Sequence, residues 1–222
     1  MAMSDQQSPP RRARALVIAV DGPAASGKGS IARALAAHFG LPHMDTGMLY
    51  RAVALSLNRF GGDPGNEFEA MRAVSGLAQV DADDPELRNE LTGSVASRIS
   101  TYPGVRAALI ERQRDFAAQD GGAVLDGRDV GTVVAPDATV KLFVTASADV
   151  RAQRRLAELV ARGVTAHFDD VLMDIHARDE RDTGRSEAPL AQAPDAIVLD
   201  TSTISLDEAV ASAIASVEAR LD

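Results

Sequence analysis

The sequence has no cysteine and no long run of apolar residues, and each absence excludes a class of protein. Without cysteine there is no disulfide scaffold, no thiol nucleophile and no thiolate metal site. A membrane-spanning helix needs about 20 apolar residues in succession, and no stretch of the chain offers them. A reducing compartment is the simplest setting for such a sequence, so we expect a cytoplasmic protein without a membrane partner.

Aromatic residues make up only 4% of the chain, and basic residues are outnumbered by acidic ones. The net charge of −9, from 32 acidic and 23 basic side chains, disfavours binding to a nucleic-acid backbone. With 222 residues, of which 45% are apolar, the composition is typical of an aliphatic α/β protein that has one domain with additional inserted segments. We therefore expect small-molecule partners, no nucleic acid, and a monomer.

A buried strand is predicted for residues 16–20, and a glycine-rich turn follows it directly. Gly22, four further residues, then Gly27 and Lys28 give the spacing of a phosphate-binding loop, in which backbone N–H groups and a helix N-terminus surround an anion. The alternative is an ordinary strand-to-helix turn with a surface lysine. The expected ATP-binding residues are Gly22, Pro23, Ala24, Ala25, Ser26, Gly27, Lys28, Gly29 and Ser30.

The residue after Lys28 is Gly29, where such loops commonly have a serine or threonine that reaches Mg²⁺. Ser30 comes one position later. This Lys-Gly-Ser ending is similar to the variant used by nucleoside monophosphate kinases. We expect Ser30 to reach a metal only through water, and the other metal ligands stay unknown.

A long stretch of helical patterns separates the second expected strand, residues 41–44, from the third. Asp45-Thr46-Gly47 follows the second strand as a helix-capping turn, as cleft-facing residues, or as both. The insertion is longer than a crossover needs, so we expect a helical subdomain that closes over a substrate. It contains Ser97 and Arg106, although an arginine on a helix is often only a solvated charge. Its predicted helices cover residues 48–60, 67–78, 84–101 and 104–119.

Asp126-Gly127-Arg128-Asp129 follows another buried apolar run. Asp-Gly between apolar runs is a hairpin signal. After a parallel strand, the same residues lie at the sheet edge where α/β folds place ligand contacts. Further along, we expect a strand at 140–145, a helix at about 148–162, a strand at 196–199 and a helix at 206–221.

Two arginine-rich helices are expected in the last third of the chain, joined by a turn that contains Gly163. Arg178, Asp182 and Arg185 are spaced i, i+4, i+7 and therefore predicted to share one helical face. Such helices resemble a mobile lid over phosphates; the alternative is a solvated face with ion pairs such as Arg154 with Glu158. The arginines of the first helix are Arg151, Arg154, Arg155 and Arg162, and those of the second are Arg178, Arg181 and Arg185.

Together these motifs resemble the bacterial cytidylate kinases, from about residue 15 to the end. The resemblance implies an α/β fold of the P-loop nucleoside monophosphate kinase type: a five-stranded parallel sheet core flanked by helices, a helical acceptor-binding subdomain and a lid. It also implies transfer of the γ-phosphate of ATP to CMP or dCMP, with Mg²⁺ as cofactor. The match is carried by residues 21–30, 44–47 with Tyr50-Arg51, 126–134, and 178–182 with Arg185 and Ala188-Pro189-Leu190.

The resemblance also implies a division of the chain and a role for each site residue. The tail would be 1–14, the core 15–45 and 121–222, the acceptor subdomain about 46–120 and the lid about 151–185. The family often has a three-stranded insert in the acceptor subdomain, whereas residues 80–94 here are short, polar and helix-like. Catalytic roles fall to Lys28, Arg154, Arg155 and Arg181, and acceptor binding to Thr46, Ser97, Arg106, Arg128, Asp129, Arg178, Asp182 and Arg185.

Asp129 is the residue we expect to select the base. A carboxylate can only accept hydrogen bonds, so it favours the amino group of cytosine over the oxygen of uracil. Another kinase of the same fold, acting on UMP or on a non-nucleotide alcohol, is the nearest alternative. A regulatory nucleotide switch is less well supported, because the chain has no Asn-Lys-x-Asp guanine motif.

Overall fold

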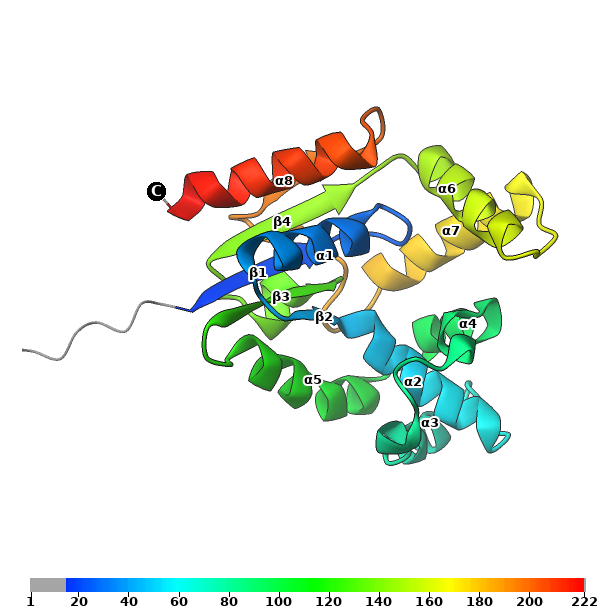
Figure 1. Ribbon diagram of the computed structural model, residues 1–222. Coiled ribbons are helices and arrows are strands. Elements are labelled where there is room, and N and C mark those ends of the chain that lie inside the picture. Colours follow the sequence, from blue (N-terminus) through cyan, green and yellow to red (C-terminus); the bar gives the residue numbers. More distant parts are fainter. Residues whose placement is uncertain (1–14, 222) are drawn as a thin grey trace, which may run out of the picture.

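The computed structural model describes residues 15–221, and a five-stranded parallel sheet lies at its centre (Figure 1). The strand order is β2-β3-β1-β4-β5, so β1 lies between β3 and β4. The predicted tail, 1–14, lies outside the described residues. The strands are β1 (Leu16–Asp21), β2 (His43–Asp45), β3 (Gly122–Gly127), β4 (Val140–Thr145) and β5 (Ile197–Asp200).

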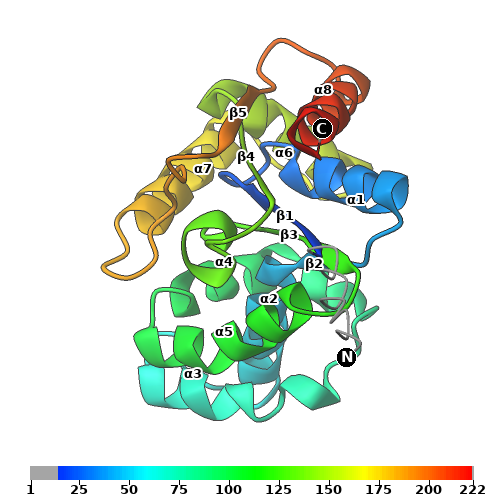
Figure 2. The same cartoon turned by 90° about the vertical axis from the view of Figure 1, so that its left-hand side faces the viewer.

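One face of the sheet is covered by α1 (Lys28–Phe39) and α8 (Leu206–Leu221), which lie side by side in Figures 1 and 2. Their apolar side chains repeat at helical spacing and meet the inward-facing residues of β1 and β4. This core includes Ile18, Val20, Ile31, Leu35, Leu142 and Val217. It fixes the start of α1, and with it the turn between β1 and α1.

The chain between β2 and β3 forms a second group of helices with a core of its own (Figure 2). It contains α2 (Thr46–Arg59), α3 (Glu67–Val74), α4 (Glu90–Ile99) and α5 (Pro103–Ala117), and no strand. The predicted helical insertion is therefore confirmed. The single helix predicted over 84–101 is wrong, because Asn89 has an extended ψ of 165° and caps α4 with its side chain. A 3-10 turn, Pro85–Arg88, precedes it, and another, Leu77–Gln79, follows α3.

Two further helices, α6 (Ala148–Ala161) and α7 (Phe168–Thr183), pack against each other beyond the carboxyl end of β4 (Figure 1). At the start of α6, Ser147 Oγ accepts a hydrogen bond from the Val150 amide. Their shared apolar cluster, which includes Leu159, Val171 and Ile175, also contains Ala24 from the turn after β1. The helix pair therefore rests on that turn.

The structure corrects one local expectation and rules out two alternatives. Asp126-Gly127 does not form a hairpin, because β3 runs parallel to both β1 and β2. Arg185 lies beyond the end of α7, which stops at Thr183 before Gly184, so it does not share a helical face with Arg178. Glu158 pairs with Arg155 rather than with Arg154. Among residues 15–221, no helix combines the length and the apolar character that a membrane span requires.

Candidate functional site

The turn between β1 and α1 is a tightly wound loop that depends on its glycines. A Cβ on Gly22 would lie 2.0 Å from the carbonyl oxygen of Val144, so only glycine fits there. Ala25 and Gly27 have positive φ angles of 58° and 91°, which bend the backbone toward the start of α1. Lys28 Nζ reaches back to the carbonyl oxygen of Pro23 at 3.4 Å. The loop and its lysine together surround a space suited to an anion.

Lys28 is a half-buried cation with charges of both signs around it. The pKa of Lys28 is lowered to about 8, mainly by burial and also by the Arg128 guanidinium, while the carboxylates of Asp126 and Asp45 oppose the shift. The ammonium group has lost water without gaining a full ion pair. An additional anion beside it would therefore be strongly favoured.

A cavity of about 510 Å³ opens in front of this loop. Its walls come from the loop, α2, α4, α5, the end of β3, α6 and α7. Segments that lie far apart in the sequence therefore enclose it. The protein as a whole is acidic, yet this wall is rich in guanidinium groups. They belong to Arg51, Arg106, Arg128, Arg155, Arg178, Arg181 and Arg185. Such a lining is suited to ligands that have several negative charges.

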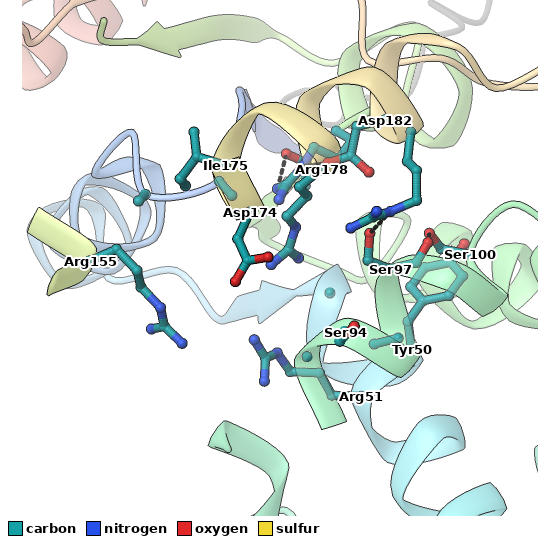
Figure 3. Close-up of a pocket in the computed structure, with 18 of the residues that line it drawn as sticks. Tyr50, Arg51, Ser94, Ser97, Ser100, Arg155, Asp174, Ile175, Arg178 and Asp182 are labelled. Atoms are coloured by element: carbon teal, nitrogen blue, oxygen red, sulfur yellow. Dashed lines mark hydrogen bonds and ion pairs between the residues drawn. The ribbon is translucent and has the colours of Figure 1, made fainter. Parts of the chain in front are cut away.

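Figure 3 shows the side chains of Arg51, Arg155 and Arg178 extending toward one another from α2, α6 and α7. The pKa of Arg178 is lowered to about 9, mainly by burial and also by the charge of the neighbouring Arg128. Within the described residues, Nε of Arg178 and Nε of Arg185 are buried without a hydrogen-bond partner. Buried donors are nearly always paired, so these groups are expected to bind a ligand oxygen.

The far end of the cavity is organised around two buried carboxylates. Asp129 forms an ion pair with Arg106, and both residues are buried. Asp182 accepts a hydrogen bond from Arg128 Nε at 2.7 Å and pairs also with Arg185. Burial tends to raise the pKa of Asp182, but the charges of Arg128, Arg185 and Arg178 hold it at about 2. Both carboxylates are thus placed to accept hydrogen bonds from a ligand.

Smaller polar groups complete this end of the cavity. Ser97 Oγ accepts from Arg181 Nε at 3.2 Å, and Thr46 Oγ1 donates to the Asp126 carbonyl at 2.9 Å. The Tyr50 ring lies 6.0 Å from the Arg106 guanidinium carbon, within range of a cation–π contact. Every residue expected to bind the acceptor therefore lines this one cavity.

Of the three arginines expected to be catalytic, two line the cavity and one does not. Arg155 and Arg181 line the cavity, whereas Arg154 does not. The Arg154 guanidinium donates to Thr201 Oγ1 at 2.9 Å and to the Thr201 carbonyl at 2.7 Å. It also reaches the carbonyl of Ser26 at 3.4 Å, which places it against the outside of the phosphate loop.

Arg151 on α6 and Arg162 at its end also lie outside the cavity wall. Arg151 is buried and binds the carbonyl of Ala24 at 3.3 Å and the carboxylate of Asp179. Arg162 donates to the Arg88 carbonyl at 3.0 Å. These arginines therefore connect α6 to the phosphate loop, to α7 and to the turn before α4.

Two carboxylates beside Lys28, Asp45 and Asp126, were not among the expected catalytic or binding residues. Asp45 and Asp126 are paired across β2 and β3, and burial together with the charge of Asp126 raises the pKa of Asp45. His43 Nε2 lies 2.7 Å from Asp126 Oδ1. The signal was present in the sequence, because Asp45 is the last residue of β2 and Asp126 the last but one of β3, but their pairing depends on β2 and β3 being neighbours.

Comparison with known proteins gives one consistent result over nearly the whole chain. A family model described as "Cytidylate kinase" matches residues 18–219. A cytidylate kinase of Rhodopseudomonas palustris (strain HaA2) is 53% identical over 204 residues, covering 92% of this chain and 96% of that protein. A cytidylate kinase of Xanthobacter autotrophicus (strain ATCC BAA-1158 / Py2) is 54% identical over 206 residues, covering 92% and 98%.

Among solved structures, similarity extends to a crystal structure of an uncharacterized protein from Eubacterium ventriosum ATCC 27560. The TM-score is 0.56 at 13% sequence identity, with 91% of this chain and 98% of that chain covered. Similarity at this level of identity supports the fold alone.

Proposed function

The chain belongs to the cytidylate kinase family, and we propose that it transfers the γ-phosphate of ATP to CMP, giving ADP and CDP. We expect dCMP to be a second acceptor. One observation supports this most directly: a phosphate loop with a half-buried lysine opens on an arginine-lined cavity that contains a buried carboxylate, Asp129, at its far end. The first part suits a triphosphate and the second suits a base with an amino group.

At the donor end, we propose that the backbone of residues 22–30 and the ammonium of Lys28 bind the phosphates of ATP. The loop N–H groups and the start of α1 provide partial positive charge, and Lys28 adds a full one. Because burial has already lowered the pKa of Lys28, the bound phosphates would offset an existing desolvation cost.

Between the two ends, we propose that Arg155, Arg178 and Arg181 stabilise the phosphoryl group as it moves. In phosphoryl transfer the charge spreads over the equatorial oxygens, and the protein contributes positioning and positive charge rather than covalent chemistry. The unpaired Nε of Arg178 is a donor that such an oxygen would satisfy. Closure of α6 and α7 over the site would exclude water as a competing acceptor.

At the acceptor end, we propose that Asp129 accepts from the amino group of cytosine while Arg106 and Ser97 fix the base. Asp182, Thr46 and Arg128 would contact the sugar and phosphate together with Arg178 and Arg185. A carboxylate that selects cytosine over uracil in this way contributes about 1–3 kcal/mol per contact. We likewise propose that residues 46–120 form the acceptor subdomain and residues 151–185 the lid.

The residues beside the phosphate loop fit Mg²⁺. This ion is usually held by one or two carboxylates together with substrate phosphates, rather than by a full cage of protein ligands. Within residues 15–221 there is no cluster of three acidic or histidine side chains, but Asp45 and Asp126 lie together beside Lys28. We propose that they and Ser30 hold the ion, in part through water. When bound, it would neutralise charge on the phosphates of ATP.

A coupled ADP-release assay with CMP, dCMP, UMP and AMP tests the function. We expect kcat/KM to be highest with CMP and dCMP, and Asp129→Asn to lower the CMP-to-UMP ratio of kcat/KM by about 5- to 150-fold. ADP release that does not depend on any acceptor, or equal use of AMP and CMP, would overturn the proposal. The monomeric state and the cytoplasmic location remain predictions.

A further inference from the structure

Asp21 connects the phosphate loop to the segment that contains Asp129. It is the last residue of β1 and directly precedes Gly22, and it is only 4% exposed. Its Oδ1 accepts from the backbone N–H of Val130 at 2.8 Å, and its Oδ2 accepts from that of Gly131 at 2.7 Å. The donors are 109 and 110 residues away in the sequence. Both carboxylate oxygens are therefore committed to one short stretch of backbone.

That stretch is the start of the π-helical turn Val130–Val134, whose first N–H groups have no partner within the turn. Asp129 occupies the N-cap position, where an aspartate usually folds back to accept from these N–H groups itself. Here the Asp129 side chain makes no capping bond and pairs instead with Arg106. The cap is supplied from the neighbouring strand by Asp21.

The two arrangements of Asp129 exclude each other. If its carboxylate capped its own turn, it would leave Arg106 and the end of the cavity. While Asp21 accepts from the N–H groups of Val130 and Gly131, these two donors no longer draw the Asp129 carboxylate toward the backbone.

We propose that Asp21 is a positioning residue for base selection: by capping the turn after Asp129, it keeps the Asp129 carboxylate on Arg106 and in the cavity, where the acceptor base is recognised. The inference rests on the proposed function, and specifically on the role of Asp129 there. It also gives the first residue of the phosphate loop and the base-selecting residue a common anchor.

The surroundings of Asp21 are shaped for this contact. A Cβ on Gly131 would lie 3.3 Å from Asp21 Oδ2 and 3.1 Å from Cδ of Lys141, so glycine lets the amide approach the carboxylate. The charged groups near Asp21 are Lys28 on α1, Asp129, and Lys141 on β4, whose ammonium pairs with Asp195 at 2.9 Å. Burial raises the pKa of Asp21 to about 6, against the two amide hydrogen bonds, which lower it. At pH 7.5 the carboxylate is therefore mostly ionised and can accept both bonds.

The test uses the variants Asp21→Asn, Asp129→Asn and the double variant in the full-length enzyme, with kcat/KM measured for CMP and UMP at saturating ATP. Asparagine replaces one acceptor oxygen by an NH₂ group, so one N–H of the turn loses its partner. We expect Asp21→Asn to lower the CMP-to-UMP ratio by at least about 5-fold, mainly through a higher KM for CMP, with the KM for ATP changed by no more than about 2-fold. The double variant should have the same ratio as Asp129→Asn alone, because Asp21 acts through Asp129.

Two further variants separate positioning from general damage. Gly131→Ala pushes on the same contact from the other side and should lower the ratio as Asp21→Asn does, which keeps the test decisive if Asp21→Asn does not fold. Asp195→Asn is the matched control: it removes a mostly exposed carboxylate that pairs with Lys141 near the same turn, and it should leave the ratio unchanged.

The outcomes distinguish the inference from the function on which it rests. A ratio that falls in Asp129→Asn but not in Asp21→Asn or Gly131→Ala overturns the inference alone, as do additive effects in the double variant or an equal effect of Asp195→Asn. A ratio unchanged in Asp129→Asn, with CMP still phosphorylated, overturns the role of Asp129 and this inference but leaves the kinase activity. Failure of the wild-type enzyme to phosphorylate CMP overturns the proposed function itself.

Discussion

Nε of Arg128 donates a hydrogen bond to Oδ2 of Asp182 at 2.7 Å, although 54 residues separate the two in the sequence. Arg128 follows the end of β3 and Asp182 lies in the last turn of α7, so the pair attaches α7 to the carboxyl end of the sheet. Asp182 is 1% exposed, and it also pairs with Arg185. The wall of the cavity therefore depends on a buried anion shared by two guanidiniums.

Replacing Asp182 by asparagine should destabilise the protein, because it leaves those guanidiniums buried without their anion. We expect Asp182→Asn to lower the free energy of unfolding by about 3–5 kcal/mol and to raise the KM for CMP. Urea unfolding and steady-state kinetics measure the two effects. Asp174→Asn, on the same helix and exposed, is the control and should change neither stability nor fold. Equal stability of the two variants would show that the buried pairs contribute little.

Asp21 should make stability depend on pH in the weakly acidic range. Its folded-state pKa of about 6 is above the unfolded value, so the folded form binds the proton more tightly. The resulting stabilisation is complete below about pH 4 and is lost as the pH rises through 6, a change of up to about 3 kcal/mol. The free energy of unfolding of the wild type, minus that of Asp21→Asn, should therefore fall between pH 4 and pH 7. A difference that stays constant over this range would contradict it.

Lys28→Met should remove activity without removing the fold. The variant loses the ammonium group beside the loop, and we expect kcat to fall at least about 100-fold. Because burial already lowers the pKa of Lys28, the apolar replacement should be no less stable than the wild type in thermal unfolding. Arg112→Met, an equal loss of charge on the exposed side of α5, is the control for net charge. Near-normal turnover in Lys28→Met would refute the role of this lysine.

The variants Arg154→Ala and Arg155→Ala can be compared directly, because the two residues are adjacent and the substitution is the same. Arg155 lines the cavity and pairs with Glu90 and Glu158 on the protein surface, so Arg155→Ala should lower kcat by about 10- to 100-fold with little loss of stability. Arg154 makes its hydrogen bonds to Thr201 and Ser26, so Arg154→Ala should reduce the unfolding free energy by about 1–3 kcal/mol. The reverse pattern would mean that α6 rearranges to bring Arg154 to the phosphates.

Much of the fold could be predicted because it depends on short-range patterns. The strand at residues 140–145 agrees with β4, and the strand, glycine loop and helix at 16–39 were set by apolar runs, glycine spacing and helical periodicity. Such signals act over a few residues, so they specify elements and leave their partners open. The error at 84–101 has the same origin: apolar spacing continued past Asn89, but the cap that this side chain forms divides the helix.

The amino-acid sequence by itself determined that a phosphate loop follows the first strand, that a helical insertion separates the second and third strands, and that arginines concentrate in two late helices. Only the tertiary structure decided which of these arginines face the cavity. Arg154 and Arg155 are neighbours in the chain, but the packing of α6 turns Arg155 to the cavity and Arg154 to Thr201. It likewise decided that Asp21 caps the turn after Asp129, because that contact requires β1 to lie beside β3. The physical reason is that local periodicity determines where each helix and strand forms. Strand order and helix packing determine which groups meet, such as the Asp21 carboxylate and backbone N–H groups about a hundred residues further along the chain.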